Sequence, residues 1–130
     1  MILDTTFAID PLRGEKRADR KARQLEERDE AVIIPTPVVL ELFVGVARSD
    51  APMSERRRIE EFTSSYGHAA LGYSEARMAG EILGNLLTRG QRIGLIDTMI
   101  ASIALSHGET ILTRNPDHFR RIEGIRIEGY

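Results

Sequence analysis

Short apolar segments alternate with helix-forming stretches along this chain, and this alternation limits the fold more than any other feature. We expect strands at Met1–Leu3, Ala31–Ile34, His68–Leu71 and Thr110–Leu112, and a fifth where Ile125–Ile127 also pairs. Strands that are separated by helices form parallel sheets that are covered on both faces. The sequence therefore predicts a single domain over residues 1–130, an α/β fold with three α/β/α layers around a parallel sheet of four to five strands.

The stretches between these strands carry signals for helix starts and ends. Thr36 followed by Pro37 is typical of a helix start, because a hydroxyl caps free amides and proline is pre-set for the first turn. Ser74 is expected to cap a later helix in the same way, and Gly90 ends that helix. Together these signals predict helices at residues 6–12, 16–30, 36–48, 52–64, 74–89 and 97–107.

Composition excludes several classes of protein. The chain has 130 residues, of which 42% are hydrophobic and 29% charged, as in an ordinary soluble globular domain. It contains no cysteine and therefore no disulfide or thiolate metal site. No apolar run approaches the roughly 20 residues of a membrane span, and no signal peptide is recognisable, so we expect no membrane association and a cytoplasmic location. The net charge of −2 gives no general attraction for nucleic acid.

Four carboxylates follow the predicted strands or lie in the helices after them, where parallel sheets bind their ligands. Asp4 follows the first strand, Asp97 begins the most apolar helix, and Asp117 follows the fourth strand by a few residues. Glu41 lies inside an apolar helical stretch, where an unpaired charge is unfavourable. Alternatively, Asp4 and Asp97 could cap helices. Glu41 could pair with an arginine, and Asp117 could be a turn residue. Their joint placement favours one shared acidic site.

A divalent cation suits such a site. Carboxylates that lie close together repel one another, and a hard cation with oxygen ligands relieves this repulsion. Mg²⁺ fits these ligands better than zinc does, and Mn²⁺ is its natural substitute. Bound metal ions can lower the pKa of a water molecule and can clamp the oxygens of a phosphodiester. The acids are therefore consistent with hydrolysis of phosphodiester bonds.

The residues that carry this chemistry lie in four stretches of fixed order, Ile2–Thr6, Pro37–Leu42, Gly94–Ala101 and Leu112–Phe119. Their order and spacing resemble those of PIN domains, and specifically of VapC-type toxin ribonucleases, over essentially the whole chain. The resemblance implies a PIN-like fold and Mg²⁺- or Mn²⁺-dependent endoribonuclease activity. It also implies that Asp4, Glu41 and Asp97 are acidic ligands.

The fourth acidic position departs from the family pattern. Family members often have an acid at the position of Asn115 or of His118, whereas the nearby acid in this chain is Asp117. We therefore treat Asp117 and Asn115 as alternative contributors and expect Asp117 to be the ligand. Thr6 and Thr113 stand where the family has small hydroxyl residues near the site, although capping of a helix or turn would explain them equally well.

The resemblance also implies partners for the protein, namely an RNA substrate, a cognate antitoxin protein and a second copy in a homodimer. We expect the antitoxin to use the helices at 6–12, 36–48 and 52–64. Anchors there could come from Phe7, Leu12, Leu42, Phe43 and Phe62, unless these side chains form the core. Several arginines could follow an RNA backbone, although a solvated surface charge would explain any one of them: Arg13, Arg48, Arg56, Arg57, Arg58 and Arg92. The alternative function is a non-catalytic PIN-like module that binds RNA or protein without cleaving RNA.

Overall fold

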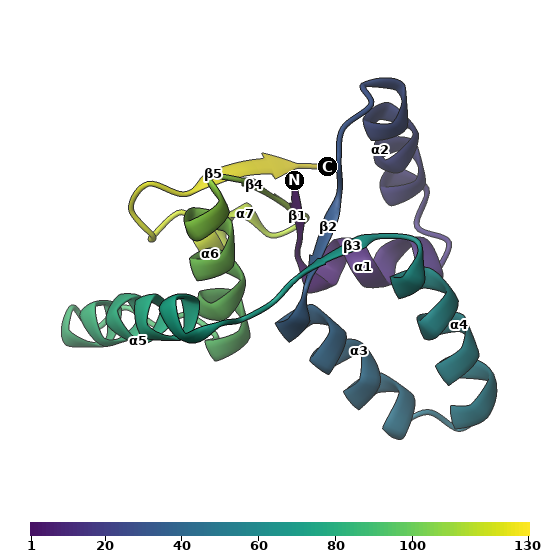
Figure 1. The fold of residues 1–130 in the computed structure, drawn as a ribbon, viewed down its shortest axis with the longest axis horizontal. Coiled ribbons are helices and arrows are strands. Elements are labelled where there is room, and N and C mark those ends of the chain that lie inside the picture. Colours follow the sequence, from purple (N-terminus) through teal and green to yellow (C-terminus); the bar gives the residue numbers. More distant parts are fainter.

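A five-stranded parallel sheet with the strand order β3-β2-β1-β4-β5 forms the centre of the computed structural model, which describes all 130 residues (Figure 1). Each of its neighbouring strand pairs is parallel. The predicted α/β fold with a parallel sheet is confirmed, including the fifth strand. The strands are β1 (Ile2–Leu3), β2 (Ile33–Pro35), β3 (Gly67–Ala69), β4 (Thr110–Thr113) and β5 (Arg126–Gly129).

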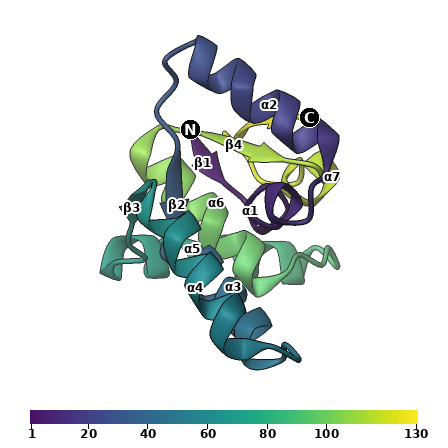
Figure 2. The ribbon, with the colours of Figure 1, turned by 90° about the vertical axis from the view of Figure 1, so that its right-hand side faces the viewer.

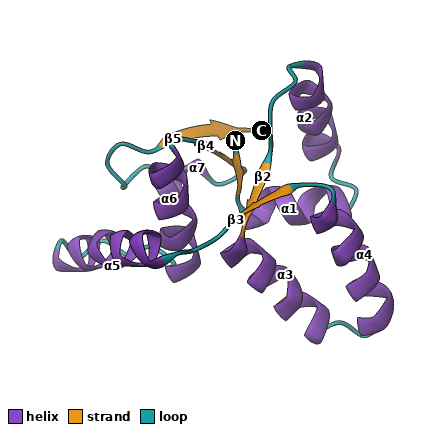
Figure 3. Ribbon diagram, viewed as in Figure 1, coloured by secondary structure: helices purple, strands orange, loops and turns teal.

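Seven helices connect these strands. In Figure 1, α1, α2 and α4 lie to the right of the strands and α5 and α6 to the left, and Figure 3 shows the same view coloured by secondary structure. Helical connections between parallel strands are right-handed. Connections that run toward β3 therefore cover one face of the sheet, and those that run toward β5 cover the other. None of the helices is both long and apolar enough to cross a membrane. The helices are α1 (Thr5–Leu12), α2 (Lys16–Glu27), α3 (Thr36–Ala47), α4 (Pro52–Ser64), α5 (Tyr73–Thr88), α6 (Leu95–His107) and α7 (Pro116–Phe119).

The hydrophobic core is built around the two central strands. Ile2 and Leu3 of β1 pair with Ile111 and Leu112 of β4, and all of these side chains are fully buried. Figure 2 shows β1 and β4 side by side, running in the same direction toward α1 and α7. Burial of both strands by apolar packing fixes the position of the residues that follow them.

Two helix caps predicted from the sequence are wrong. Pro35 is the N-cap of α3, and the hydroxyl of Thr36 instead accepts a hydrogen bond of 3.0 Å from the backbone N–H of Leu71. Gly72 is the N-cap of α5, and its N–H donates to the carboxylate of Glu75 over 3.1 Å. At the start of α3, the hydroxyl of Thr36 accepts from a residue distant in the sequence and does not cap the helix. At the start of α5, the carboxylate of Glu75, which lies within the helix, accepts the hydrogen bond from the N-cap residue.

Other element boundaries also differ from the prediction. The helix expected at residues 16–30 ends at Glu27, because Asp29 adopts a left-handed backbone conformation with φ 51°. The helix expected to begin at Asp97 begins at Leu95, with Gly94 as its N-cap. Asp97 therefore lies in the first turn of α6 and does not cap it. The short helix α7 was not predicted.

Candidate active site

The candidate site lies at the carboxyl ends of β1 and β4. The chain leaves β1 through α1 toward β2, and it leaves β4 through α7 toward β5, on the other side of the sheet. Parallel sheets bind ligands where neighbouring connections diverge in this way, because the divergence leaves a crevice. Asp4 directly follows β1, and Thr113 is the last residue of β4.

Asp4 is a buried carboxylate, 4% exposed, that accepts hydrogen bonds from several donors. Its Oδ1 accepts from the Thr6 hydroxyl over 2.7 Å and from the Phe7 backbone N–H over 2.9 Å. Its Oδ2 accepts from the Thr113 hydroxyl over 2.6 Å. Burial raises the pKa of the Asp4 carboxyl above its ordinary value, these hydrogen bonds oppose the shift, and the charge of Asp97 adds to it. Asp4 is thus both the N-cap of α1 and a candidate ligand.

Thr6 and Thr113 connect Asp4 to the loop between β4 and α7. The Thr6 hydroxyl accepts a hydrogen bond of 3.1 Å from the Arg114 backbone N–H, and the Thr113 hydroxyl accepts one of 2.9 Å from Asn115. Each hydroxyl therefore accepts from the loop and directs its own hydrogen at the Asp4 carboxylate. These contacts fix the rotamer of Asp4.

Asp97 is the second carboxylate at this edge of the sheet. A Cβ added to Gly94 would lie 3.3 Å from Oδ2 of Asp97, so the glycine leaves room for this carboxylate to fold back over the start of α6. The same oxygen lies 3.1 Å from Nδ1 of His118, within hydrogen-bond distance. The side chain that α7 brings to Asp97 is therefore His118.

The structure does not bring Asp117 to Asp4 or Asp97. The Asp117 side chain is 80% exposed and forms an ion pair of 2.6 Å with Arg120. Asn115, the alternative at this position, contacts the site through its backbone N–H, which donates to Thr113. The carboxylate of Asp117 thus behaves as a surface group of α7.

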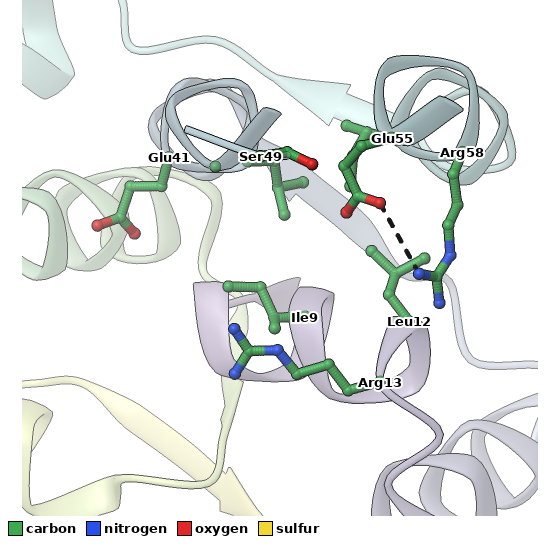
Figure 4. Close-up of a pocket in the computed structure, with 10 residues that line it drawn as sticks. Ile9, Leu12, Arg13, Glu41, Ser49, Glu55 and Arg58 are labelled. Atoms are coloured by element: carbon green, nitrogen blue, oxygen red, sulfur yellow. Dashed lines mark ion pairs between the residues drawn. The ribbon is translucent and has the colours of Figure 1, made fainter. Parts of the chain in front are cut away.

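Glu41 projects from α3 at the edge of a groove between α1, α3 and α4 (Figure 4). The hydroxyl of Thr5 donates a hydrogen bond to the Glu41 carboxylate. Because Thr5 follows Asp4 directly, this contact holds Glu41 at the start of α1, near the buried acid. No ion pair joins Glu41 to an arginine, which was the alternative explanation for its place in an apolar helix. The hydrogen bond from Thr5 offsets the unfavourable partial burial instead.

Apolar and charged side chains alternate along this groove. Ile9 and Leu12 of α1 form one wall and Ile59 of α4 contributes to the other, while Glu55 and Arg58 pair at 3.9 Å. Of the apolar anchors expected for a partner protein, Leu12 and Leu42 line the groove, although Leu42 is 4% exposed and belongs to the core. The other expected anchors do not line it: Phe7 is in the core, Phe43 lies under Arg56, and Phe62 packs on Tyr66.

Asp10 is a buried acid that the sequence analysis missed. Its carboxylate pairs with the Arg114 guanidinium at 2.9 Å and accepts a hydrogen bond of 2.8 Å from the Tyr130 hydroxyl. The pKa of Tyr130 is raised, mainly by burial and further by the charge of Asp10. Asp10 thus ties α1 to the loop after β4 and to the end of the chain. No pattern in the sequence indicated this role for Asp10, because an acid in the middle of a short helix is usually exposed.

The carboxylates of the candidate site are the kind of ligand that a hard divalent cation prefers. No three Asp, Glu or His side chains lie close enough together to hold one ion. Asp4 and Asp97 offer carboxylate oxygens, and their mutual repulsion would be relieved by a cation. Two protein carboxylates are compatible with Mg²⁺, which usually keeps several water ligands. Glu41 stands nearby on α3 as a further carboxylate.

Comparison with known proteins identifies this fold as that of a PIN domain. The family model described as "PIN domain" matches residues 1–125, so this chain belongs to the PIN domain family. Within the family, the chain is 29% identical over 129 residues to the tRNA(fMet)-specific endonuclease VapC of Shigella flexneri, covering 99% of this chain and 96% of that protein. Its identity to the protein of the same name from Salmonella typhimurium is 30%, with the same coverage.

A solved structure shows the same similarity. The crystal structure of DNA-bound VapBC from Salmonella typhimurium matches with a TM-score of 0.88 and 29% identity, covering 98% of this chain and 96% of that chain. The predicted resemblance to PIN domains and VapC ribonucleases is confirmed.

Proposed function

We propose that this protein is a metal-dependent endoribonuclease of the VapC type and the toxin of a toxin–antitoxin pair. The observation that carries the proposal is the pair of carboxylates, Asp4 and Asp97, at the point where the connections of a PIN fold diverge. Relatives that match nearly the whole chain are named as ribonucleases or endonucleases, and two of them are named as tRNA(fMet)-specific. The cellular substrate would be RNA in the cytoplasm.

Each residue of the proposed site has a role. Asp4 and Asp97 would hold Mg²⁺ or Mn²⁺, with Glu41 as a third contributor. When bound, the ion would lower the pKa of a water molecule and neutralise charge on the phosphodiester. Thr6 and Thr113 hold the Asp4 carboxylate in one orientation, which favours a fixed geometry of the site.

We assign the fourth acidic position differently from the sequence analysis, which expected Asp117 to be a ligand. The exposed Asp117, paired with Arg120, is not part of the site that we propose. His118 contacts Asp97 and would orient this carboxylate in its place.

The activity is tested by incubating the purified protein with a mixed pool of RNA. We expect cleavage in the presence of Mg²⁺ or Mn²⁺ and none in EDTA, because the acids alone cannot stabilise the negative charge that develops at the phosphodiester. RNA that is bound but remains intact with either metal would support the alternative, a non-catalytic PIN-like module.

We further propose that a cognate antitoxin covers the groove between α1, α3 and α4. VapBC complexes are found among the similar solved structures. The groove offers apolar side chains for a docking segment, including Ile9 and Leu12, and the Glu41 carboxylate at its edge for a basic side chain. We also retain the homodimer that the family resemblance implies as part of this proposal.

Co-expression with the product of the neighbouring gene tests this partner. We expect the two proteins to purify together, the pair to be inactive toward RNA, and growth arrest to be relieved. A Leu12→Glu variant should weaken the pair, since a charge would then face the apolar groove. The matched control is Leu87→Glu, at a residue of α5 that is 57% exposed, and this variant should leave the pair of proteins intact. Growth arrest that persists on co-expression, without a co-purifying protein, would contradict the toxin–antitoxin assignment while leaving the nuclease assignment standing.

A further inference from the structure

A second hollow, of about 360 Å³, is lined in part by Asp97. It is formed where the loop between α5 and α6 meets the segment after α7. Its lining residues are Arg92, Ile93, Gly94, Asp97, His118 and Arg121. The hollow thus shares Asp97 with the candidate active site and is otherwise lined mainly by basic and neutral residues.

Arg92 and Arg121 carry two positive charges that no acidic side chain neutralises. Neither forms an ion pair, and both line the hollow. Nη1 of Arg121 donates a hydrogen bond of 2.6 Å to the backbone carbonyl of Arg92. This bond joins the two loops and leaves the other N–H groups of the Arg121 guanidinium available for a ligand.

The first turn of α6 adds to the positive character of the hollow. Gly94 is the N-cap of this 13-residue helix, and no side chain caps it. The amides of the first turn lack partners within the helix and favour an anion nearby. The arginines and these amides therefore attract the same kind of ligand.

Positive charge beside the candidate site would reduce the electrostatic repulsion between this acidic protein and an RNA substrate. The protein carries a net charge of −2 and its candidate site is acidic, so a polyanion gains no general attraction. Two arginines beside Asp97 would offset this repulsion where the substrate must approach. The arginine guanidinium also matches the geometry of phosphate oxygens.

We propose that Arg92, Arg121 and the start of α6 form a subsite for an RNA backbone phosphate next to the phosphodiester that is cleaved. This inference rests on the proposed ribonuclease function and extends it by naming the residues that position the substrate. The subsite directs the strand past Asp97 from the side of the α5–α6 loop.

The test compares the double variant Arg92→Ala/Arg121→Ala with wild type in two assays. Binding of a labelled single-stranded RNA, measured by fluorescence anisotropy in EDTA, is expected to weaken about 10-fold. The magnitude of the slope of log K against log salt concentration should fall by about 0.7, since the subsite neutralises one phosphate and each neutralised phosphate contributes about 0.7 for a single strand. In Mn²⁺, KM should rise about 10-fold while kcat remains near that of wild type.

The matched control is Arg23→Ala/Arg77→Ala, which removes the same charge from exposed positions on α2 and α5. It should bind RNA almost as wild type does. Equal weakening by both double variants would overturn the proposal, because only total charge would then matter. Inorganic phosphate is the second probe. We expect wild type to bind RNA more tightly than phosphate, and equal affinity for the two ligands would overturn the proposal, because the site would then have no preference for RNA. Binding in EDTA needs no cleavage, so an inactive protein would still report on the subsite.

Discussion

An Asp97→Asn variant is expected to retain its fold and to cleave RNA at least ~100-fold more slowly than wild type, since positioned metal ions supply several kcal/mol to such reactions. The substitution removes the negative charge but keeps the shape of a side chain that is partly exposed in the first turn of α6. Circular dichroism confirms the fold, and initial rates in Mn²⁺ give the effect. Asp4→Asn and Glu41→Gln should follow the same trend.

Metal binding gives an independent measurement of the same change. Mn²⁺ well above its Kd is expected to raise the melting temperature of wild type, because it binds the folded protein. This rise should be largely lost in Asp97→Asn. Asp117→Asn is the control, because its exposed, paired side chain should affect neither quantity. Undiminished cleavage by a folded Asp97→Asn protein would refute the mechanism, and a large loss in Asp117→Asn would return that residue to the site.

Asp10→Ala is expected to lower the free energy of unfolding by about 2 kcal/mol. Breaking a buried ion pair by removing one partner usually costs more, but Arg114 is 46% exposed and can turn to water. Tyr130→Phe removes only the hydrogen bond to Asp10 and should cost about 1 kcal/mol.

Urea unfolding of the variants measures these differences. Asp50→Ala is the matched control, because Asp50 is exposed in the loop between α3 and α4 and forms no ion pair. A stability of Asp10→Ala equal to that of Asp50→Ala would show that the Asp10 contacts contribute nothing.

The alternation of strands and helices was predictable from local patterns, and with it the edge of the sheet where the acids would lie. Asp4 was predictable as a residue of this edge because it follows a short apolar strand in a parallel fold. The order of the strands was not predictable, since no local pattern specifies which strands pair. The partners of Asp10 could not be found for the same reason: Arg114 and Tyr130 lie 104 and 120 residues away in the sequence.

The choice between Asp117 and its neighbours depended on a detail that sequence does not contain. Successive residues of a helix point about 100° apart, so a single-residue change in where α7 begins decides which side chain faces Asp97. Pro116 begins α7, and this start turns His118 to Asp97 and Asp117 to solvent. The spacing of the motif alone could not resolve that rotation.

The double role of Asp4 has a practical consequence for capturing a bound substrate. Any substitution there alters the cap of α1 and removes the acceptor for Thr6, Phe7 and Thr113, so the inactive protein would also have a disturbed binding surface. The side chain of Asp97 has one hydrogen-bond partner, His118. Asp97→Asn is therefore the better bait: it should hold an intact RNA on an undisturbed surface for cross-linking and sequencing of the captured strand.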